Sequence, residues 1–465
     1  MSGPEQLIEI VMNDRSYVVS KSKLIEQSDY FRALYSSGMR ESEEDSVQLQ
    51  GLSVSGLELV LEFINTSKVQ VENETLEDLI DTASFLQVTP ILKLLLSEIR
   101  LDNCVELFNL SEVYGTHELR KACLKFMSSN YHVMLRTPEF HTLPGDLQEQ
   151  IRDLRMRGTA TLVAVGHFMG TRLDLTSEEK PWSMLCYGEG ERRWKTLTDS
   201  LPPDMVSVRG YGSAVLDNYL FIVGGYRMTS QEISAAHCYN PCRNEWFPVA
   251  SLNQKRANFK LVAVTGKLFA VGGHCLNTVE YYCPQQDWWT CVSSMPDPLT
   301  EFSATECQGM IYVMGGYTAS DRNTNVLRYC PISDTWSVLH TCPVHVRKQQ
   351  MLSVEDTIYL VGGYTRELER ADHGEDMLTV QSYNVRTCLW LQLQSNVSKS
   401  GLNLTCALHN DGIYIMSHDV GPRTGLEHRV FTKYNVFTDA WEGFSRFSTL
   451  GHNALLCSLY LPNVL

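Results

Sequence analysis

The sequence lacks the features that mark membrane-spanning, secreted and nucleic-acid-binding proteins. Its 465 residues contain no uninterrupted apolar run that approaches the roughly 18 residues of a membrane span. The N-terminal segment "MSGPEQLIEIVMNDRSYVV" has no basic stretch followed by an apolar stretch of signal-peptide length. The net charge is −15, which is opposite to the basic surface that phosphate contacts need. We therefore expect no membrane insertion and no nucleic-acid binding.

Metal-binding and catalytic motifs are also missing. The 14 cysteines are scattered, with no C-x-x-C pair and no Cys/His cluster of zinc-binding spacing. There is no Walker A sequence, no G-x-S-x-G, no H-E-x-x-H and no dinucleotide fingerprint. We therefore expect no cofactor, no metal and no catalytic residue. Without a secretory signal the cysteines should be reduced, as in the cytosol or the nucleus.

What the sequence does have is a repeated segment. "DNYLFIVGGY", residues 217–226, is followed by "TGKLFAVGGH" from 265, "QGMIYVMGGY" from 308 and "EDTIYLVGGY" from 355. Weaker copies, "TATLVAVGHF" from 159 and "NDGIYIMSHD" from 410, extend the series on both sides. The interval is close to the length of a kelch repeat, about 50 residues.

A second mark recurs in the same register. In each copy a Tyr stands seven residues before a Trp, as Tyr187/Trp194, Tyr239/Trp246, Tyr282/Trp289, Tyr329/Trp336, Tyr383/Trp390 and Tyr434/Trp441. The residues between them are rich in Pro, Asn, Asp and Ser, which favour turns. The pattern predicts that each Tyr and Trp lie on paired strands of one hairpin.

Each repeat offers four short strands, which is the content of one propeller blade. The glycine pairs then end a strand where a neighbouring blade leaves no room for a Cβ. The first repeat begins at its second strand, while the tail "GHNALLCSLYLP" (451–462) resembles a spare first strand. We therefore predict a six-bladed kelch β-propeller over residues 158–465, closed by the C-terminal strand.

The first third of the chain is different. The stretch "LIEIVMNDRSYVV" alternates around an Asn-Asp turn and predicts a hairpin. Helical faces follow, such as Leu57, Val60, Leu61 and Ile64, and Ser28 is suited to begin a helix. This pattern indicates a mixed α+β domain followed by helices.

Sequence segments of this region resemble known domains. "SDYFRALYSSGMRES", "LELVLEFINTSKVQV" and "LIDTASFLQV" resemble a BTB/POZ domain, which we place at residues 1–100. "NCVELFNLSEVYGTHELRKACLKFMSSNYHVM" resembles a BACK domain, here short, which we place with a linker at 101–157. With the kelch repeats, this order resembles the kelch-like family over essentially the whole chain.

The resemblance implies a function. Members are non-catalytic substrate adaptors of cullin-3 RING ubiquitin ligases, in which the BTB and BACK parts bind cullin-3 and the propeller binds the client. Carried over to this sequence, the cullin-binding residues are Met39, Arg40 and Glu41, with Leu107, Phe108 and Tyr114 in the BACK part. The alternative for the motif is that Met39 packs locally and Glu41 is a solvated charge.

The resemblance also implies a client surface at one mouth of the propeller channel. The residues at that mouth are Arg209, Tyr211, Tyr226, Arg227, Asn258, Phe259, Glu301, Phe302, Tyr317, Arg347, Lys348, Tyr364 and Arg366. Arginine and aromatic residues are common interface hot spots. Basic residues dominate but Glu301 interrupts them, so we expect a client peptide that contains acidic residues.

Other interpretations stay open. The chain could be a BTB–kelch scaffold for cytoskeletal or nuclear partners without ubiquitin transfer. A propeller enzyme, such as a kelch-type copper oxidase, would need a Tyr, His and Cys constellation on one face. Homodimerisation through BTB is implied, but Leu7 and Ser20 replace an Asp and a His that most relatives carry near that interface. We expect a cytoplasmic location, with cytoskeletal association and a nuclear location left open.

Overall fold

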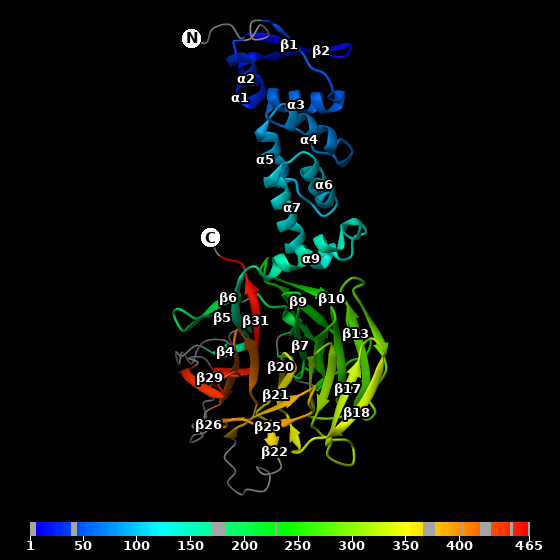
Figure 1. Cartoon of the computed structure of the whole chain (residues 1–465), viewed down its shortest axis with the longest axis vertical. Coiled ribbons are helices and arrows are strands. Elements are labelled where there is room, and N and C mark those ends of the chain that lie inside the picture. The colour runs from blue at the N-terminus through cyan, green and yellow to red at the C-terminus, as the bar shows by residue number, and fades with distance from the viewer. Residues whose placement is uncertain are drawn as a thin grey trace. The chain divides into compact units, whose positions relative to one another are not determined.

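The computed structural model describes residues 6–38, 44–169, 182–198, 200–205, 207–227, 230–365, 377–401, 403–418, 429–446 and 450–463. The chain divides into two compact units, Met1–Leu154 and Arg155–Leu465. Figure 1 shows that the first unit is mainly helical and that the second is built from strands.

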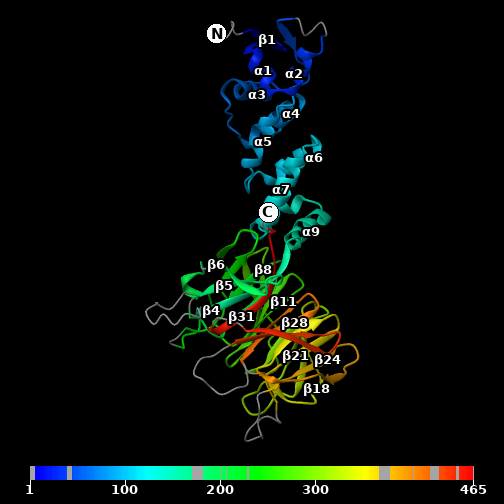
Figure 2. The same ribbon diagram turned by 90° about the vertical axis from the view of Figure 1, so that its left-hand side faces the viewer.

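The first unit combines a small sheet with a series of helices. Strand β1 (Leu7–Met12) pairs antiparallel with β2 (Arg15–Ser20), which confirms the predicted hairpin, and β3 (Ser46–Gln48) lies parallel to β1. The helices are α1 (Lys21–Gln27), α2 (Asp29–Ser36), α3 (Val54–Thr66), α4 (Leu76–Phe85), α5 (Thr89–Ser97), α6 (Cys104–Val113), α7 (His117–Ser129), α8 (Tyr131–Met134) and α9 (Gly145–Asp153). Figure 2 shows α6 and α7 packed side by side.

Helix boundaries and faces follow the local sequence. The Ser28 side chain accepts a hydrogen bond from the Phe31 N–H (3.2 Å) and so caps α2 as predicted. The predicted apolar face of α3 is buried, because Leu57, Val60 and Ile64 are all in the core.

The second unit contains, within its described residues, six four-stranded antiparallel sheets. In the first blade β31 (Leu450–Leu461) precedes β4 (Thr159–Met169), β5 (Ser183–Gly188) and β6 (Arg193–Thr198) in the sheet order. The second blade consists of β7 (Gly212–Leu216), β8 (Tyr219–Val223), β9 (Ala236–Asn240) and β10 (Glu245–Val249). The third blade consists of β11 (Lys260–Val264), β12 (Lys267–Gly273), β13 (Leu276–Cys283) and β14 (Trp288–Val292).

The remaining blades follow the same order. They are β15 (Ser303–Cys307), β16 (Met310–Met314), β17 (Asn325–Cys330), β18 (Thr335–Thr341); β20 (Gln350–Val354), β21 (Thr357–Val361), β24 (Val380–Asn384), β25 (Trp390–Gln392); and β27 (Thr405–His409), β28 (Gly412–His418), β29 (Arg429–Asn435), β30 (Ala440–Arg446). Short ribbons join β19 (Val346–Arg347) to β22 (Tyr364–Thr365) and β23 (Met377–Leu378) to β26 (Asn396–Ser400).

The C-terminal strand closes the ring, as the sequence predicted. Strand β31 pairs antiparallel with β4 along its length, from Leu450 opposite Met169 to Leu461 opposite Thr159, and Figure 1 shows the two side by side. Asn218, in the β7–β8 turn, fastens this strand to the next blade. Its amide donates to the Tyr460 carbonyl (2.8 Å) and accepts from the Tyr460 N–H (2.8 Å).

The Tyr and Trp of each repeat lie directly opposite one another on the third and fourth strands. Each predicted pair, from Tyr187↔Trp194 to Tyr434↔Trp441, is a register partner. The ring centroids are close, for example 5.0 Å for Tyr329 and Trp336. These pairs supply the bulk that fills the wedge between blades.

The glycine pairs end the second strand where the next blade begins, which is the reason predicted for them. At Gly315 (φ +72°) a Cβ would lie 2.2 Å from the Val346 carbonyl oxygen of the following blade. The N–H of its neighbour Gly316 donates to the same oxygen (2.9 Å). A side chain at this position would break both the packing and the hydrogen bond.

Candidate functional site

The predicted client segments lie at one end of the propeller. In an antiparallel meander the loop after the second strand and the connection into the next first strand leave the sheet at the same end. The backbones of these segments pair: Arg209 exchanges hydrogen bonds with Tyr226 (2.9 and 2.8 Å), and Arg347 lies opposite Tyr364 in the β19–β22 ribbon. We call this end the mouth.

An ion-pair cluster forms at the mouth between the fourth and fifth blades. The two oxygens of Glu301 bind different cations, Arg347 Nη1 at 2.8 Å and Lys348 Nζ at 3.1 Å. Burial by itself raises the pKa of Glu301, but the hydrogen bonds from Arg347 and Lys348 outweigh it and hold that pKa below its usual value. The cluster therefore carries two positive charges and one negative charge.

Aromatic rings pack against the Arg347 side chain of this cluster. The Arg347 guanidinium lies over the Tyr364 ring (4.3 Å to the centroid) and farther from the Tyr317 ring (5.6 Å). The ring of His345, which is buried, lies 5.0 Å from that of Tyr317, and its Nε2 is 2.9 Å from the Gly316 carbonyl oxygen. Ring stacking leaves the planar guanidinium suited to bidentate contact with a carboxylate.

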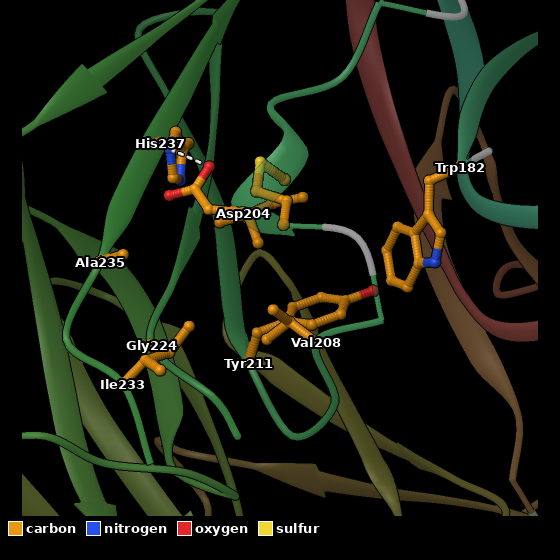
Figure 3. A pocket seen from close by; sticks show the side chains of 10 residues that line it. Trp182, Asp204, Val208, Tyr211, Gly224, Ile233, Ala235 and His237 are labelled. Atoms are coloured by element: carbon orange, nitrogen blue, oxygen red, sulfur yellow. Dashed lines mark ion pairs between the residues drawn. The ribbon is translucent and has the colours of Figure 1, made fainter. Parts of the chain in front are cut away.

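A second part of the mouth lies between the first and second blades. Trp182, Met205, Val208, Tyr211 and Ile222 are among the residues that line a small cavity of about 10 Å³, about the room one water needs. Figure 3 shows Tyr211 beside Trp182, with ring centroids 6.1 Å apart, and Asp204 pointing at His237.

The His237 and Asp204 side chains form the polar corner of this cavity. His237 Nε2 lies 3.2 Å from Asp204 Oδ1, and Figure 3 marks this contact with a dashed line. Burial lowers the pKa of His237, and the Asp204 charge opposes that shift only in part. Arg209 and Arg227, which belong to the mouth segments of the second blade, are exposed.

Two predicted client residues are in the core instead. Phe259 is 2% exposed and Phe302 is 1% exposed. A Cβ at Gly212 or Gly272 would lie within about 3 Å of these rings, so the two phenylalanines fill the space that the glycines leave. The prediction that their side chains contact a client is therefore wrong, because each ring packs beside a glycine of the preceding blade. Asn258, which directly precedes Phe259, is exposed.

The predicted cullin-binding residues divide into three groups. Leu107 and Phe108 are buried (0% and 4% exposed) and pack inside α6, so their side chains do not form a free surface. Tyr114, at the end of α6, is half-buried. Met39, Arg40 and Glu41 lie outside the described residues, as does Arg366 of the client set.

Sequence reasoning missed several mouth residues. Trp182, Asp204, His237 and His345 lie outside the repeated motifs, so no pattern pointed to them. Lys260 was also missed, although it directly follows Phe259 and lines the channel.

Comparison with known proteins decides the family. The model of the BTB/POZ domain matches residues 8–100, and that of the kelch motif matches 207–253, 255–296 and 298–343. "Kelch-like protein 42" of Mus musculus is 58% identical and that of Homo sapiens 56%, each over 99% of this chain and 99% of the relative. The chain belongs to the kelch-like family. A more distant relative, "Kelch domain-containing protein 7A" of Mus musculus, is 36% identical over 47% of this kelch-like chain.

In the described ranges, His, Cys, Asp and Glu do not form any group of three or more that could hold a metal ion. None of the described helices is long and apolar enough to cross a membrane. The 14 cysteines, all of which the structure describes, are free thiols.

Proposed function

We propose that this kelch-like chain is a substrate-recognition adaptor of a cullin-3 RING ubiquitin ligase. The observation that carries the proposal is the joining, in one chain, of a BTB/POZ domain at residues 8–100 to a closed six-bladed propeller. A closed propeller presents loops on a rigid scaffold, which suits recognition of a protein client. The chain itself would be non-catalytic, with ubiquitin transfer performed by the RING subunit.

The cullin-3 surface would centre on Met39, Arg40 and Glu41, with Tyr114 at its edge. An unbranched thioether such as Met39 adapts to an apolar groove. We place the BTB/POZ domain at 1–100, the BACK helices and linker at 101–157 and the propeller at 158–465. In this assignment Leu107 and Phe108 support α6 from inside and do not contact the cullin directly.

The client surface would be the mouth. Its members with accessible side chains are Arg209, Tyr211, Tyr226, Arg227, Asn258, Glu301, Tyr317, Arg347, Lys348 and Tyr364. Because four of these are cations and one is an anion, a client peptide with acidic residues fits best.

The BTB domain would also form a homodimer. Leu7 and Val18 lie on the outer face of the β1–β2 hairpin and are 55% and 64% exposed. Exposed apolar side chains of this size on one face favour association. Ser20, by contrast, is buried and bonds Ser22 (2.9 Å), so it is not available to a partner.

The test is affinity purification of the full chain from cytoplasmic extract, with and without an inhibitor of cullin neddylation. An adaptor should recover cullin-3 in both samples and should recover more client when the ligase is inhibited. A scaffold of cytoskeletal or nuclear partners would recover its partners equally in both samples and no cullin-3, and this result would replace the adaptor proposal.

A further inference from the structure

The innermost strands of the six blades enclose a polar channel. Its volume is about 540 Å³, and its wall includes residues of β7, β11, β15, β20, β27 and β31. Most wall side chains are small or neutral, such as Ser213, Thr305, Ser353 and Ser458. A channel of this size has room for one or more client side chains.

One cation and one anion line this channel among the described residues: Lys260 and Glu306. Lys260 is the first residue of β11. In four other blades the innermost strand begins instead with an uncharged residue, namely Gly212, Ser303, Gln350 or Thr405. Among these five blades, the positive charge at this position is therefore a feature of one blade and not of the repeat.

Lys260 lies just inside the mouth. The exposed Asn258 is two residues earlier in the chain, so the two Cα atoms are at most about 7 Å apart. From there β11 runs to the turn at Gly266, at the opposite end of the channel. A side chain that enters through the mouth can therefore reach the Lys260 ammonium.

No carboxylate of the described residues neutralises this ammonium. Glu306 lies toward the other end of the channel, where its Oε1 accepts the Gly309 N–H (2.8 Å) in the turn after β15. Lys260 is partly buried, and this burial lowers its pKa, because a cation without a counter-ion loses hydration there. The outer cations Arg347 and Lys348 differ, since both are paired with Glu301.

We propose that Lys260 is the anion-binding residue of the channel, and that it pairs with a carboxylate which an Asp or Glu side chain of the client inserts through the mouth. The inference rests on the proposed client-binding role of the mouth. It adds a specificity-determining residue inside the channel to the surface residues around it. A bound carboxylate would restore the favourable interactions that the ammonium lost on burial.

The experiment uses peptides and no cullin. Random 12-residue peptides displayed on phage are selected on the full chain, and the enriched peptides are synthesised with an amidated C-terminus. Their Kd is measured on the parent, K260M, K260R and K255M. Lys255 is exposed on the connection before β11, so K255M removes an equal charge outside the channel.

We expect enriched peptides to share an Asp or Glu. Their binding should weaken at least about tenfold in K260M, as expected for a lost charge-assisted hydrogen bond, and change little in K260R and K255M. A melting temperature of K260M at or above that of the parent would show that the fold is intact, since the variant removes a partly buried charge.

Two results would overturn the inference: no enrichment of acidic peptides, or equal affinity of K260M and the parent for the enriched peptides. Cullin-3 binding is measured separately on the same variants. A chain that binds acidic peptides through Lys260 but never binds cullin-3 would refute the adaptor proposal and leave this inference standing.

Discussion

At the residue scale, Asp334 joins two blades with one carboxylate oxygen. Its Oδ1 accepts the Tyr329 hydroxyl (2.7 Å) within its own blade and the Ser293 N–H (2.9 Å) of the preceding blade. The Trp336 indole N–H returns a hydrogen bond to the Ser293 carbonyl (2.8 Å). Asp287 and Asp439 make the same pair of contacts in their blades. This arrangement explains why a Tyr and a Trp recur at a fixed distance.

Replacing Asp334 with Ala should lower the free energy of unfolding by about 1–3 kcal/mol, because two donors lose their acceptor. Asn at this position should retain most of the stability, since Asn244 accepts the Tyr239 hydroxyl at 2.8 Å in the second blade. Chemical denaturation of D334A and D334N checks this. An Ala variant as stable as the parent would show that the Asp334 hydrogen bonds do not contribute to the free energy of unfolding.

The same carboxylate should make stability depend on pH. Burial by itself raises the pKa of Asp334, but hydrogen bonds from Ser293 and Tyr329 outweigh it and lower that pKa. A lowered folded-state pKa contributes stability above the unfolded pKa of about 4, and the contribution is lost as pH falls through the folded pKa. The parent should therefore lose stability relative to D334N between about pH 5 and pH 3. If the free energies of unfolding of the parent and D334N change equally over this pH range, the Asp334 carboxylate does not cause the pH dependence.

At the element scale, the β16 strand shows what the glycine pairs do. Gly309 precedes this strand and Gly315 follows it, with φ of +75° and +72°. A Cβ at Gly309 would meet nothing within 4 Å, whereas one at Gly315 would lie 2.2 Å from the Val346 oxygen. The two glycines thus share a backbone conformation and differ only in packing.

This difference makes a matched pair of variants. Gly309→Ala should cost about 1 kcal/mol for the left-handed backbone alone. Gly315→Ala should cost distinctly more, because the next blade must also move. Thermal unfolding measures both. If both variants lose the same stability, Gly315 is required only for its left-handed backbone and not for close packing of the next blade.

The C-terminal strand is the second critical element. Cys457 and Leu459 belong to a core cluster that includes Val163 and Leu220 of the first two blades. Deleting residues 450–465 should abolish cooperative unfolding of the propeller, because it opens a sheet edge and exposes this core. Deleting only 462–465, which lie beyond β31, should leave the melting temperature nearly unchanged. A long deletion that melts like the parent would contradict closure by β31.

The sequence was sufficient for these elements because their signals repeat. Six Tyr–Trp offsets and the missing first strand are enough to predict the strand register and the closure. The repeated pattern does not predict which side chains are exposed at the mouth. Asn258 is exposed and Phe259 is buried, and only the position of the first residue of β11 decides which of the two turns inward.

Contacts between segments that are far apart in the chain also could not be predicted from the sequence. The binding of Glu301 to both Arg347 and Lys348 depends on two connections from different blades meeting at the mouth. For the same reason, the position of Lys260 inside the channel became clear only from the closed ring.

At the scale of the whole molecule, the proposed function needs two separate binding surfaces on one chain. The mouth and channel of the propeller would bind the client, and the BTB part would bind cullin-3. Loss of either surface should therefore leave binding at the other intact.

The direct measurement is the affinity of purified cullin-3 for the full chain and for Met39→Ala, Glu41→Ala, with Glu44→Ala as a nearby exposed control. We expect the double variant to bind cullin-3 about 30-fold more weakly or worse, because a buried interface anchor is lost. Glu44→Ala should bind cullin-3 normally, and all variants should bind the selected acidic peptides equally. Absence of cullin-3 binding by the parent chain would contradict the adaptor account.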